Sequence, residues 1–270
     1  MKKGIYIRSL IDYCDNEIEK TDVDIIVVGN YGCARASPSF EQCISTSKKL
    51  QKKKRLLHYI SPKLSEAAFE NEFKKVLSLL NDNISVSIND WGLVYRLKPY
   101  IKMEHNLYIG RLLTTSFANL VWDEVFLRNE SEQAKQYLWQ NNMNDKNKID
   151  LLNNYSIKGI EVDAVNKIEN SCRRIREMGL QIIGYTKDTL LSVSRSCPIK
   201  RYFGEHDANC KTLCCNKYII KPTGQKSRNI YPEMYLQGNV LYQVRENDDL
   251  YDFYTLVVNE NYTKNRKESI

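Results

Sequence analysis

Four cysteines gather in one stretch late in the chain, and thiols at such density are typical of a metal site. Twelve residues separate Cys197 from Cys210, three separate Cys210 from Cys214, and Cys215 follows directly. Cysteine thiolates bind iron–sulfur clusters and zinc alike, and both need four donors that converge on one point. Because adjacent residues seldom direct both sulfur atoms at one centre, this stretch supplies three ligands and the fourth must come from elsewhere.

Cys33 is the natural candidate for the fourth ligand. It follows the apolar run 24–29 within the segment Gly29-Asn30-Tyr31-Gly32-Cys33. The run is typical of a buried strand, and α/β folds place their sites at the carboxyl ends of such strands. The alternative is a scatter of buried, inert thiols. We expect that alternative for the remaining cysteines, which are Cys14, Cys43 and Cys172, the last on the core face of a predicted helix.

The composition suits one packed globular domain over residues 1–270, since 42% of the residues are hydrophobic and 27% are charged. The first segment lacks the apolar stretch of a secretory signal, and no run approaches the length of a membrane span. We therefore expect a cytoplasmic protein without a membrane span. In that compartment the eight cysteines remain reduced thiols or metal ligands.

The elements that must position these cysteines follow an alternating pattern of strands and helices. A helix is predicted to begin at Ser61-Pro62, and another carries the stripe Val165, Ile168, Cys172 and Ile175 before Gly179. Such alternation predicts an α/β fold with a parallel sheet, either closed into a TIM-barrel-type (β/α) barrel or open and doubly wound. The predicted strands are the apolar runs 4–8, 24–29, 55–60, 84–89, 106–110, 159–163 and 181–185.

The alternation stops after about residue 186. We expect a Cys-rich loop over residues 197–215, followed by short strands near 218–221 and 239–244 that pack against the barrel. The segment 129–154 is rich in Asn, Gln and Lys, and it predicts an exposed helical insertion. The last residues, 261–270, are expected to fray.

Four segments together resemble a known family. They are Gly29-Asn30-Tyr31-Gly32-Cys33-Ala34-Arg35, Ser87-Ile88-Asn89-Asp90-Trp91-Gly92, Gly110-Arg111-Leu112-Leu113, and Ser194-Arg195-Ser196-Cys197 followed by Cys210 and Cys214. In this order, over residues 5–238, the chain resembles the UbiV-like branch of the collagenase-like peptidase family. The resemblance implies a barrel-like fold and a 4Fe-4S cluster held by Cys33, Cys197, Cys210 and Cys214.

The same resemblance implies a function. Members of the UbiV-like branch act with a UbiU-like partner in the oxygen-independent hydroxylation of ubiquinone precursors, and other relatives hydroxylate RNA bases with prephenate as oxygen donor. This chain would then be a heterodimer subunit of such a hydroxylase, acting on a small aromatic molecule. The run 114–117 lacks the Asp-Pro-Arg that we expect downstream, Cys215 is extra, and the 129–154 insertion is unusual. These departures put the quinone substrate in doubt more than the cluster.

Asp90 and Arg111 are the candidate catalytic residues. Asp90 follows the predicted strand 84–88, so it should open onto the same face as Cys33, with Trp91 as a wall of the site. It would accept a proton or bind substrate there, or else form ordinary turn hydrogen bonds. Arg111 and Arg195 would bind a carboxylate through two hydrogen bonds, or else pair with a structural acid.

Other functions are alternatives. The chain could be a non-catalytic partner subunit whose cluster or zinc ion stabilises an interaction surface. A peptidase needs a nucleophile or an activated water, and the His-Glu-x-x-His, Gly-x-Ser-x-Gly and P-loop motifs are absent from the sequence. A Cys–His nucleophile would pair Cys33 with His58 or His105, where satisfied polar side chains are the simpler expectation. His206 is an alternative metal ligand or a plain loop residue.

The net charge of +7 raises the alternative of a nucleic-acid partner. The densest basic run lacks the interleaved aromatic residues that stack on bases. A solvated helix end is therefore the favoured interpretation of this run, which consists of Lys48, Lys49, Lys52, Lys53, Lys54 and Arg55.

Overall fold

The structure is a computed structural model that describes residues 1–7, 22–119, 123–204, 210, 217–220, 233–245, 252, 254–259 and 267–269. Four residues singled out in the sequence lie outside this described part, namely Cys14, His206, Cys214 and Cys215.

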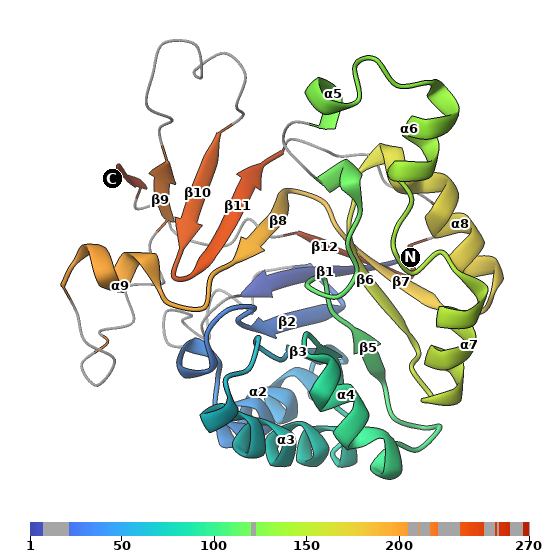
Figure 1. Cartoon of the computed structure of the whole chain (residues 1–270). Coiled ribbons are helices and arrows are strands. Elements are labelled where there is room, and N and C mark those ends of the chain that lie inside the picture. Colours follow the sequence, from blue (N-terminus) through green and yellow to red (C-terminus); the bar gives the residue numbers. More distant parts are fainter. Residues whose placement is uncertain are drawn as a thin grey trace.

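Eight parallel strands close into a barrel, so the closed alternative of the predicted α/β fold is confirmed (Figure 1). All seven predicted strands are present, and the eighth, β12, closes the barrel between β1 and β7. The sequence did not predict β12, which is a short apolar run late in the chain. In barrel order the strands are β1 (Lys2–Ile7), β12 (Leu256–Asn259), β7 (Gln181–Tyr185), β6 (Gly159–Asp163), β5 (Leu107–Ile109), β4 (Ser85–Ile88), β3 (Leu56–Ile60) and β2 (Ile25–Gly29).

Helices cover the outside of the barrel, and the main hydrophobic core lies between them and the strands (Figure 1). Alternate strand residues such as Ile26, Val28, Ile160 and Val162 belong to this core, as the period of two in a strand requires. The helices are α2 (Phe40–Gln51), α3 (Glu66–Asn81), α4 (Trp91–Leu97), α5 (Asp123–Phe126), α6 (Glu132–Leu138), α7 (Lys146–Asn154), α8 (Glu169–Glu177) and α9 (Pro198–Tyr202).

The predicted helix start at Ser61-Pro62 is wrong, because α3 begins at Glu66 after the N-cap Ser65. Ser61 is fully buried and its amide donates to the carbonyl of Ser87, which extends the pairing of β3 with β4 by one step. Strand pairing therefore takes precedence over the local cap signal. In the polar segment 129–154, Ile149 and Leu152 of α7 are buried in the main core, so this helix packs onto the barrel.

A second sheet stands beside the barrel and contains five strands in the order β13, β9, β10, β11 and β8 (Figure 1). Its strands β9 (Lys217–Ile220) and β11 (Val240–Val244) match the short strands predicted near 218–221 and 239–244, whereas β10 (Met234–Gln237) was not predicted. The sequence did not predict β8 (Asp188–Val193), which follows β7 after a two-residue turn, or β13 (Lys267–Ser269). Gly238 has a φ of 62° in the tight turn between β10 and β11, a conformation that suits glycine.

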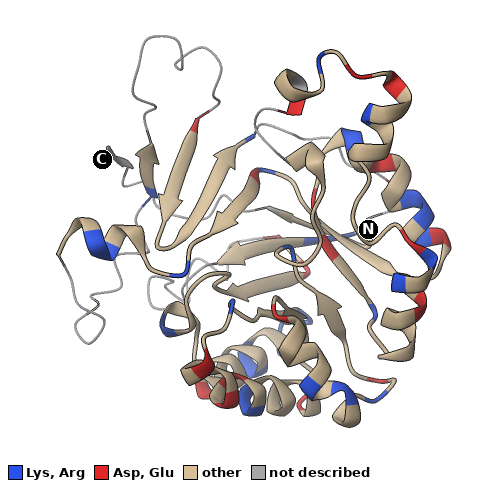
Figure 2. Cartoon of the chain, in the orientation of Figure 1, with Lys and Arg blue, Asp and Glu red and all other residues tan. Residues whose placement is uncertain are grey.

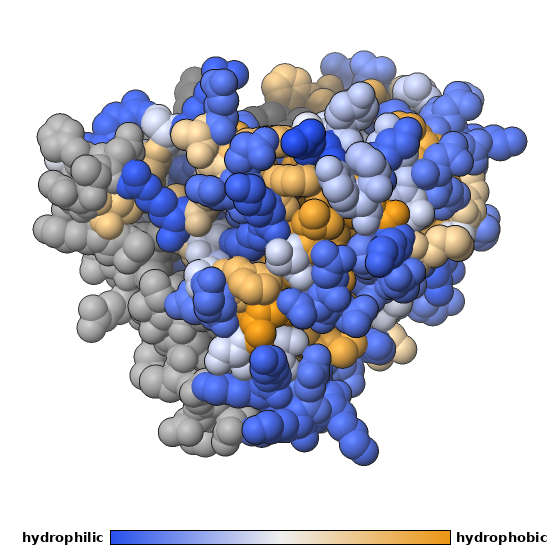
Figure 3. All heavy atoms as spheres, turned by 90° about the horizontal axis from the view of Figure 1, so that it is seen from below, coloured by the Kyte–Doolittle hydropathy of each residue, from blue (hydrophilic) through white to orange (hydrophobic). Residues whose placement is uncertain are grey.

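Charged residues of both signs are spread along the helices. Lysine and arginine alternate with aspartate and glutamate along the helices (Figure 2). Seen from below, the apolar side chains form small areas between hydrophilic ones (Figure 3). Lys48 and Lys49 lie in the last turn of α2, which agrees with the interpretation of the basic run as a helix end. Among the described residues, no helix is long and apolar enough to cross a membrane.

Candidate functional site

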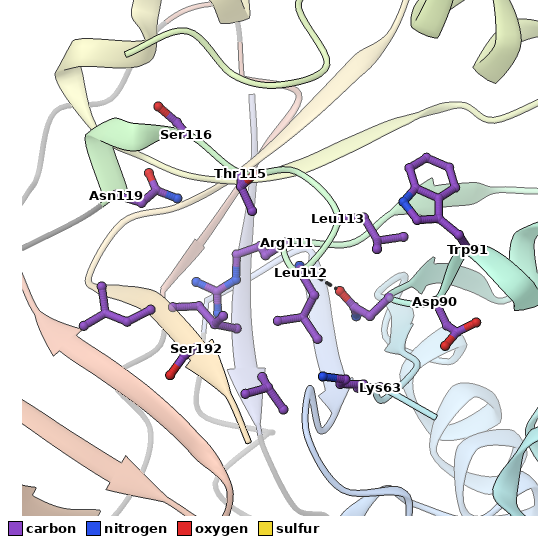
Figure 4. Close-up of a pocket in the computed structure, with 14 residues that line it drawn as sticks. Lys63, Asp90, Trp91, Arg111, Leu112, Leu113, Thr115, Ser116, Asn119 and Ser192 are labelled. Atoms are coloured by element: carbon purple, nitrogen blue, oxygen red, sulfur yellow. Dashed lines mark hydrogen bonds between the residues drawn. The ribbon is translucent and has the colours of Figure 1, made fainter. Parts of the chain in front are cut away.

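A cavity of about 500 Å³ lies at the carboxyl ends of β4 and β5, the face where barrels of this type place their sites. Trp91 and Asp90 lie on one side, Asn119 and Ser116 on the other, and Arg111 and Leu112 lie between them (Figure 4). The segment after β3 and the strand β8 complete the lining. The lining residues are Lys63, Asn89, Asp90, Trp91, Arg111, Leu112, Leu113, Thr115, Ser116, Asn119, Leu190, Leu191, Ser192 and Val193.

The lining mixes apolar and polar residues, as small-molecule sites do. Leucine and valine side chains and the indole of Trp91 make up six of the fourteen lining residues, and the other eight are polar or charged. Lys63 contributes a cation, and Ser192 contributes a hydroxyl. The cavity therefore suits a small molecule with an apolar or aromatic body and polar substituents. Of the cysteines that the structure describes, none is among the lining residues.

Asn89 joins three strand ends beneath this cavity. Its side-chain amide donates to the carbonyl of Ser61 at 2.8 Å. Its Oδ1 accepts from the amide of Leu112 at 3.0 Å, the bond drawn as a dashed line in Figure 4. A Cβ atom on Gly110 would lie 2.3 Å from Asn89 Oδ1, so only glycine fits there. The sequence analysis noted Asn89 only as part of a motif, and the structure assigns it the task of holding the loop after β5.

Asp90 has the structural role that was one of its two predicted alternatives. Its Oδ1 accepts a 3.0 Å hydrogen bond from the amide of Leu93, and Asp90 is thus the N-cap of α4. The residue also lines the cavity together with Trp91, whose side chain is 44% exposed. A chemical role for the Asp90 carboxylate stays a prediction, and its cap role is an observation.

Arg111 is buried and pairs with an acid, which was the structural alternative for this residue. Its Nη1 donates to Asp163 Oδ1 at 2.7 Å and to the carbonyl of Asp188 at 3.1 Å. The guanidinium carbon lies 4.7 Å from the ring centre of Tyr31 and 3.9 Å from that of Tyr185, within the range of cation–π contacts. Burial raises the pKa of Asp163, and the positive charge of Arg111 opposes that rise.

Arg195, the other arginine considered as a carboxylate ligand, is exposed and is not among the residues that line the cavity. Of the two arginines, only Arg111 therefore reaches the candidate site. The guanidinium of Arg111 is held in place by Asp163 and the two tyrosine rings. Arg111 therefore forms a rigid part of the cavity floor.

Glu161 is the centre of a polar network inside the barrel. It is fully buried, and its carboxylate accepts from the hydroxyl of Tyr185 at 2.7 Å and from that of Tyr31 at 3.4 Å. The Nε2 atom of His58 lies 3.2 Å away. Burial alone would raise the pKa of Glu161, but hydrogen bonds and the charge of His58 outweigh it and hold that pKa below its ordinary value. The carboxylate is thus ionised and well satisfied.

Sequence reasoning did not identify this network, although one signal was present. Glu161 and Asp163 alternate with Ile160 and Val162 in a strand whose five residues are all buried. Two acids in a strand covered on both faces must have partners, because an unpaired buried charge is costly. That rule predicts that both acids have hydrogen-bonding or charged partners, but it does not identify those partners.

His58 does not form the nucleophile pair that we considered for it. Its Nδ1 lies 2.7 Å from Ser85 Oγ, and its Nε2 lies 2.8 Å from Ser87 Oγ and beside Glu161. This order of serine, histidine and acid resembles a hydrolase triad, yet the His58 side chain is only 1% exposed and lies outside the cavity lining. His105 accepts from the amide of Lys102 in a turn. Among the described contacts, neither histidine meets Cys33, so both rings are satisfied structural groups.

Cys33 lies far from Cys197 and Cys210 in the sequence, yet its segment adjoins that of Cys197, because the side chain of Asn239 donates to the carbonyls of both Gly32 and Ser194. Burial raises the pKa of Cys197, the amides of Lys200 and Ile199 lower it, and the charges of Cys33 and Cys210 raise it further. All three are partly exposed, so ions can reach them.

The other described cysteines are fully buried in the core. Cys43 and Cys172 are 0% exposed and belong to the main core. Burial raises the pKa of each to about 12, which is typical of inert core thiols. The prediction that Cys172 lies on the core face of its helix is confirmed.

The partly exposed thiols of Cys33, Cys197 and Cys210 fit a thiolate-bound metal group in donor type. Within the described ranges, no three His, Cys, Asp or Glu side chains already lie close enough to hold a metal ion unaided. The predicted fourth donor, Cys214, lies outside those ranges. The ligand set Cys33, Cys197, Cys210 and Cys214 therefore stays a prediction, consistent with the residues present.

Comparison with known proteins leaves the family open. No family model matches the chain, and no curated protein matches it significantly in sequence. One similar solved structure is described as the U32 peptidase Mk0906, with 13% identity and a TM-score of 0.48 over 96% of this chain and 92% of that one. A likeness at this level carries no argument about family or function.

Proposed function

We propose that this chain holds a 4Fe-4S cluster on Cys33, Cys197, Cys210 and Cys214, on the carboxyl side of a barrel that also contains a small-molecule cavity. The observation that carries the proposal is the contact of the Asn239 side chain with the carbonyls of Gly32 and Ser194, which brings the segments of Cys33 and Cys197 side by side. Cys33 and Cys197 are both partly exposed, so two thiols from segments distant in sequence are available to one metal group. Partial exposure and sulfur donors favour a metal group over a packing role.

A cluster with four cysteine ligands has no open iron position, so when bound it supplies electrons and not a substrate-binding site. Substrate would therefore bind in the cavity. Its leucine and valine walls and Trp91 would contact an aromatic body, while Lys63 and Ser192 would contact polar substituents. Asp163 and the tyrosine rings fix Arg111 in the floor, so the cavity is formed before a ligand enters.

The reaction proposed for this site is a step of oxygen-independent hydroxylation of a small aromatic molecule, with prephenate as oxygen donor. The resemblance of the sequence motifs to the UbiV-like branch is what supports this reaction class. The cavity supports it only in its size and in its mixture of apolar and polar lining. Asp90 and Arg111 keep their candidate catalytic roles because both line the cavity.

Anaerobic purification followed by iron, acid-labile sulfide and zinc analysis tests the cluster. We expect a brown protein with iron and sulfide in equal amounts, about four of each per chain for a 4Fe-4S cluster. A colourless protein that contains zinc would overturn the redox role and favour the alternative of a non-catalytic subunit with a structural metal. A protein that binds neither metal would overturn the thiolate site altogether.

The second part of the proposal is a heterodimer with a UbiU-like partner. Co-expression with such a chain, affinity capture under anaerobic conditions and size-exclusion chromatography test it. We expect a complex with one copy of each chain. Full turnover by the lone monomer would overturn the partner requirement, whereas a lone monomer that binds the cluster without turnover agrees with it.

A further inference from the structure

Asn239 ties together the two chain segments that carry Cys33 and Cys197. It lies directly before β11, and its side-chain nitrogen donates to the carbonyl of Gly32 at 2.5 Å and to that of Ser194 at 3.0 Å. The main chain joins in, because the amide of Ser194 donates to the carbonyl of Asn239 at 2.9 Å. One residue therefore fixes both segments to the hairpin of the second sheet.

Each of the two segments leads directly to a cysteine. Gly32 precedes Cys33, and Ser194 lies three positions before Cys197. Ser194 Oγ also donates to the carbonyl of Ser196 at 2.7 Å, which shapes the intervening turn. The bonds of Asn239 thus act on the backbone next to both thiols, although Gly32 and Asn239 are 207 positions apart.

The contact between Asn239 and Gly32 is tight enough to exclude any side chain. A Cβ atom on Gly32 would lie 2.0 Å from Asn239 Oδ1 and 2.6 Å from its Cγ. Asn239 is 7% exposed, and its Oδ1 has no hydrogen-bond partner among the described residues. The side-chain nitrogen of Asn239 makes two hydrogen bonds, whereas its oxygen makes none among the described residues. The stabilising contribution of this amide therefore comes from the nitrogen.

The turn of Cys33 has a separate internal support. Asn30 Oδ1 accepts from the amides of Gly32 and Cys33, both at 2.9 Å. Asn30 therefore shapes the loop, whereas Asn239 sets where that loop lies relative to the segment of Cys197. These are different tasks, and only the second brings distant thiols together.

We propose that Asn239 is a positioning residue that holds the segments of Cys33 and Cys197 side by side, so that the two thiols can serve one metal group. The metal group in this inference rests on the proposed function. The arrangement of the two segments does not, because it is present in the metal-free chain. Asn239 touches neither sulfur atom in any described contact, so it acts through the backbone of Gly32 and Ser194.

Cross-linking of the metal-free protein tests the positioning directly. A short bis-maleimide should join Cys33 to Cys197 in the unsubstituted chain, and peptide mass spectrometry would measure the yield. Asn239→Ala removes both side-chain bonds, and we expect a roughly tenfold lower rate of this cross-link, since one or two hydrogen bonds correspond to about that factor. Iron loss from the loaded protein to a chelator should be faster by a similar factor.

Two further variants separate positioning from a general loss of stability. Gln243→Ala is the matched control, because Gln243 lies on β11 just after Asn239, is also 7% exposed and likewise has an oxygen without a partner among the described residues. It should leave cross-linking and iron retention unchanged. Gly32→Ala should reproduce the loss, because its methyl group displaces the Asn239 side chain. In the background of Asn239→Ala that methyl group should add little.

The outcomes distinguish this inference from the function on which it rests. If the unsubstituted chain binds no iron but Asn239→Ala still slows the cross-link, the cluster proposal fails and the positioning role stands. If the unsubstituted chain binds iron and Asn239→Ala matches it in cross-linking and in iron retention, the positioning role fails alone. An equal loss in Gln243→Ala would also overturn it, because general destabilisation would then explain both.

Discussion

The Nη1 atom of Arg111 donates a 2.7 Å hydrogen bond to Asp163 Oδ1 in the barrel interior, where the two side chains are 0% and 3% exposed. The pair joins the end of β5 to the end of β6 beneath the cavity. A buried pair adds little stability compared with apolar residues of the same shape, but the loss of one partner leaves the other charge without compensation. The pair therefore contributes rigidity to the floor of the cavity.

Arg111→Met should lower the free energy of unfolding by about 3–5 kcal/mol, because Asp163 remains buried without its cation. Urea denaturation followed by circular dichroism measures this. Arg173→Met is the matched control, since Arg173 pairs with Asp252 at the surface and its removal should leave the unfolding free energy unchanged. A loss in Arg111→Met no larger than that of the control would contradict the role of the buried pair.

Glu161→Gln should destabilise the protein most at neutral pH. The pKa of Glu161 in the folded chain lies below its ordinary value of 4.5, so its stabilising contribution is present above pH 4.5 and is lost as the pH falls through the lowered pKa. The difference in unfolding free energy between the two proteins should thus shrink below pH 4.5. The raised pKa of Asp163 makes the unfolding free energy change with pH in the opposite direction. Because Asp163 is present in both proteins, its contribution cancels when their unfolding free energies are subtracted. A difference that stays constant across this range would contradict the assignment.

Asp90 can be tested by two substitutions that separate its cap role from its charge. Asn caps a helix as well as Asp does, whereas Ala does not, so Asp90→Ala should cost about 1 kcal/mol of stability and Asp90→Asn very little. Both should keep their iron, because Asp90 is not a predicted ligand. We expect Asp90→Asn to reduce turnover of the complex with the partner. Unchanged turnover in this variant would leave Asp90 with its observed role as the cap of α4.

The sequence predicted the parts of the fold that repeat and missed those that depend on single distant contacts. Strands such as β2 and β6 are preceded and followed by helical patterns, and that alternation identified them. The strand β12 has four residues and lies well beyond the point at which the alternating sequence pattern stops, so no local pattern distinguished it from other short apolar runs. The strand β8 was missed because its pairing with β11 is antiparallel and begins only two residues after β7.

In the candidate site, too, the sequence predicted features that follow a general rule and missed those that depend on distant contacts. The rule that sites lie at the carboxyl ends of strands led to Asp90, which lines the cavity together with Arg111, and the catalytic role of both residues stays a prediction. The partners of His58 and Glu161 could not be predicted, because 103 positions separate them and several strand orders would satisfy the same pattern. Asn239 gave no signal, since a polar residue after glycine in a hairpin is ordinary turn chemistry.

Single replacement of each predicted ligand by alanine tests the ligand set. Loss of one thiolate leaves an iron–sulfur cluster labile or unassembled, so each of these variants should lose most of its iron and colour under anaerobic purification. Core thiols are the matched controls, and their replacement should keep the iron and cost only about 1 kcal/mol of packing stability. The ligand variants are Cys33→Ala, Cys197→Ala, Cys210→Ala and Cys214→Ala, and the controls are Cys43→Ala and Cys172→Ala, with Cys14→Ala as a further non-ligand variant.

Cys215 is the one cysteine that we expect to replace a lost ligand. It adjoins Cys214, so its thiol is the nearest substitute in the sequence when Cys214 is removed. We therefore expect Cys214→Ala to retain part of its iron, and the double variant with Cys215→Ala to retain almost none. The remaining ligand positions have no neighbouring cysteine, so their variants should show no such partial retention. A full and stable cluster in Cys33→Ala would contradict the distant ligand, and the shared neighbourhood of Cys33 and Cys197 would then need another purpose.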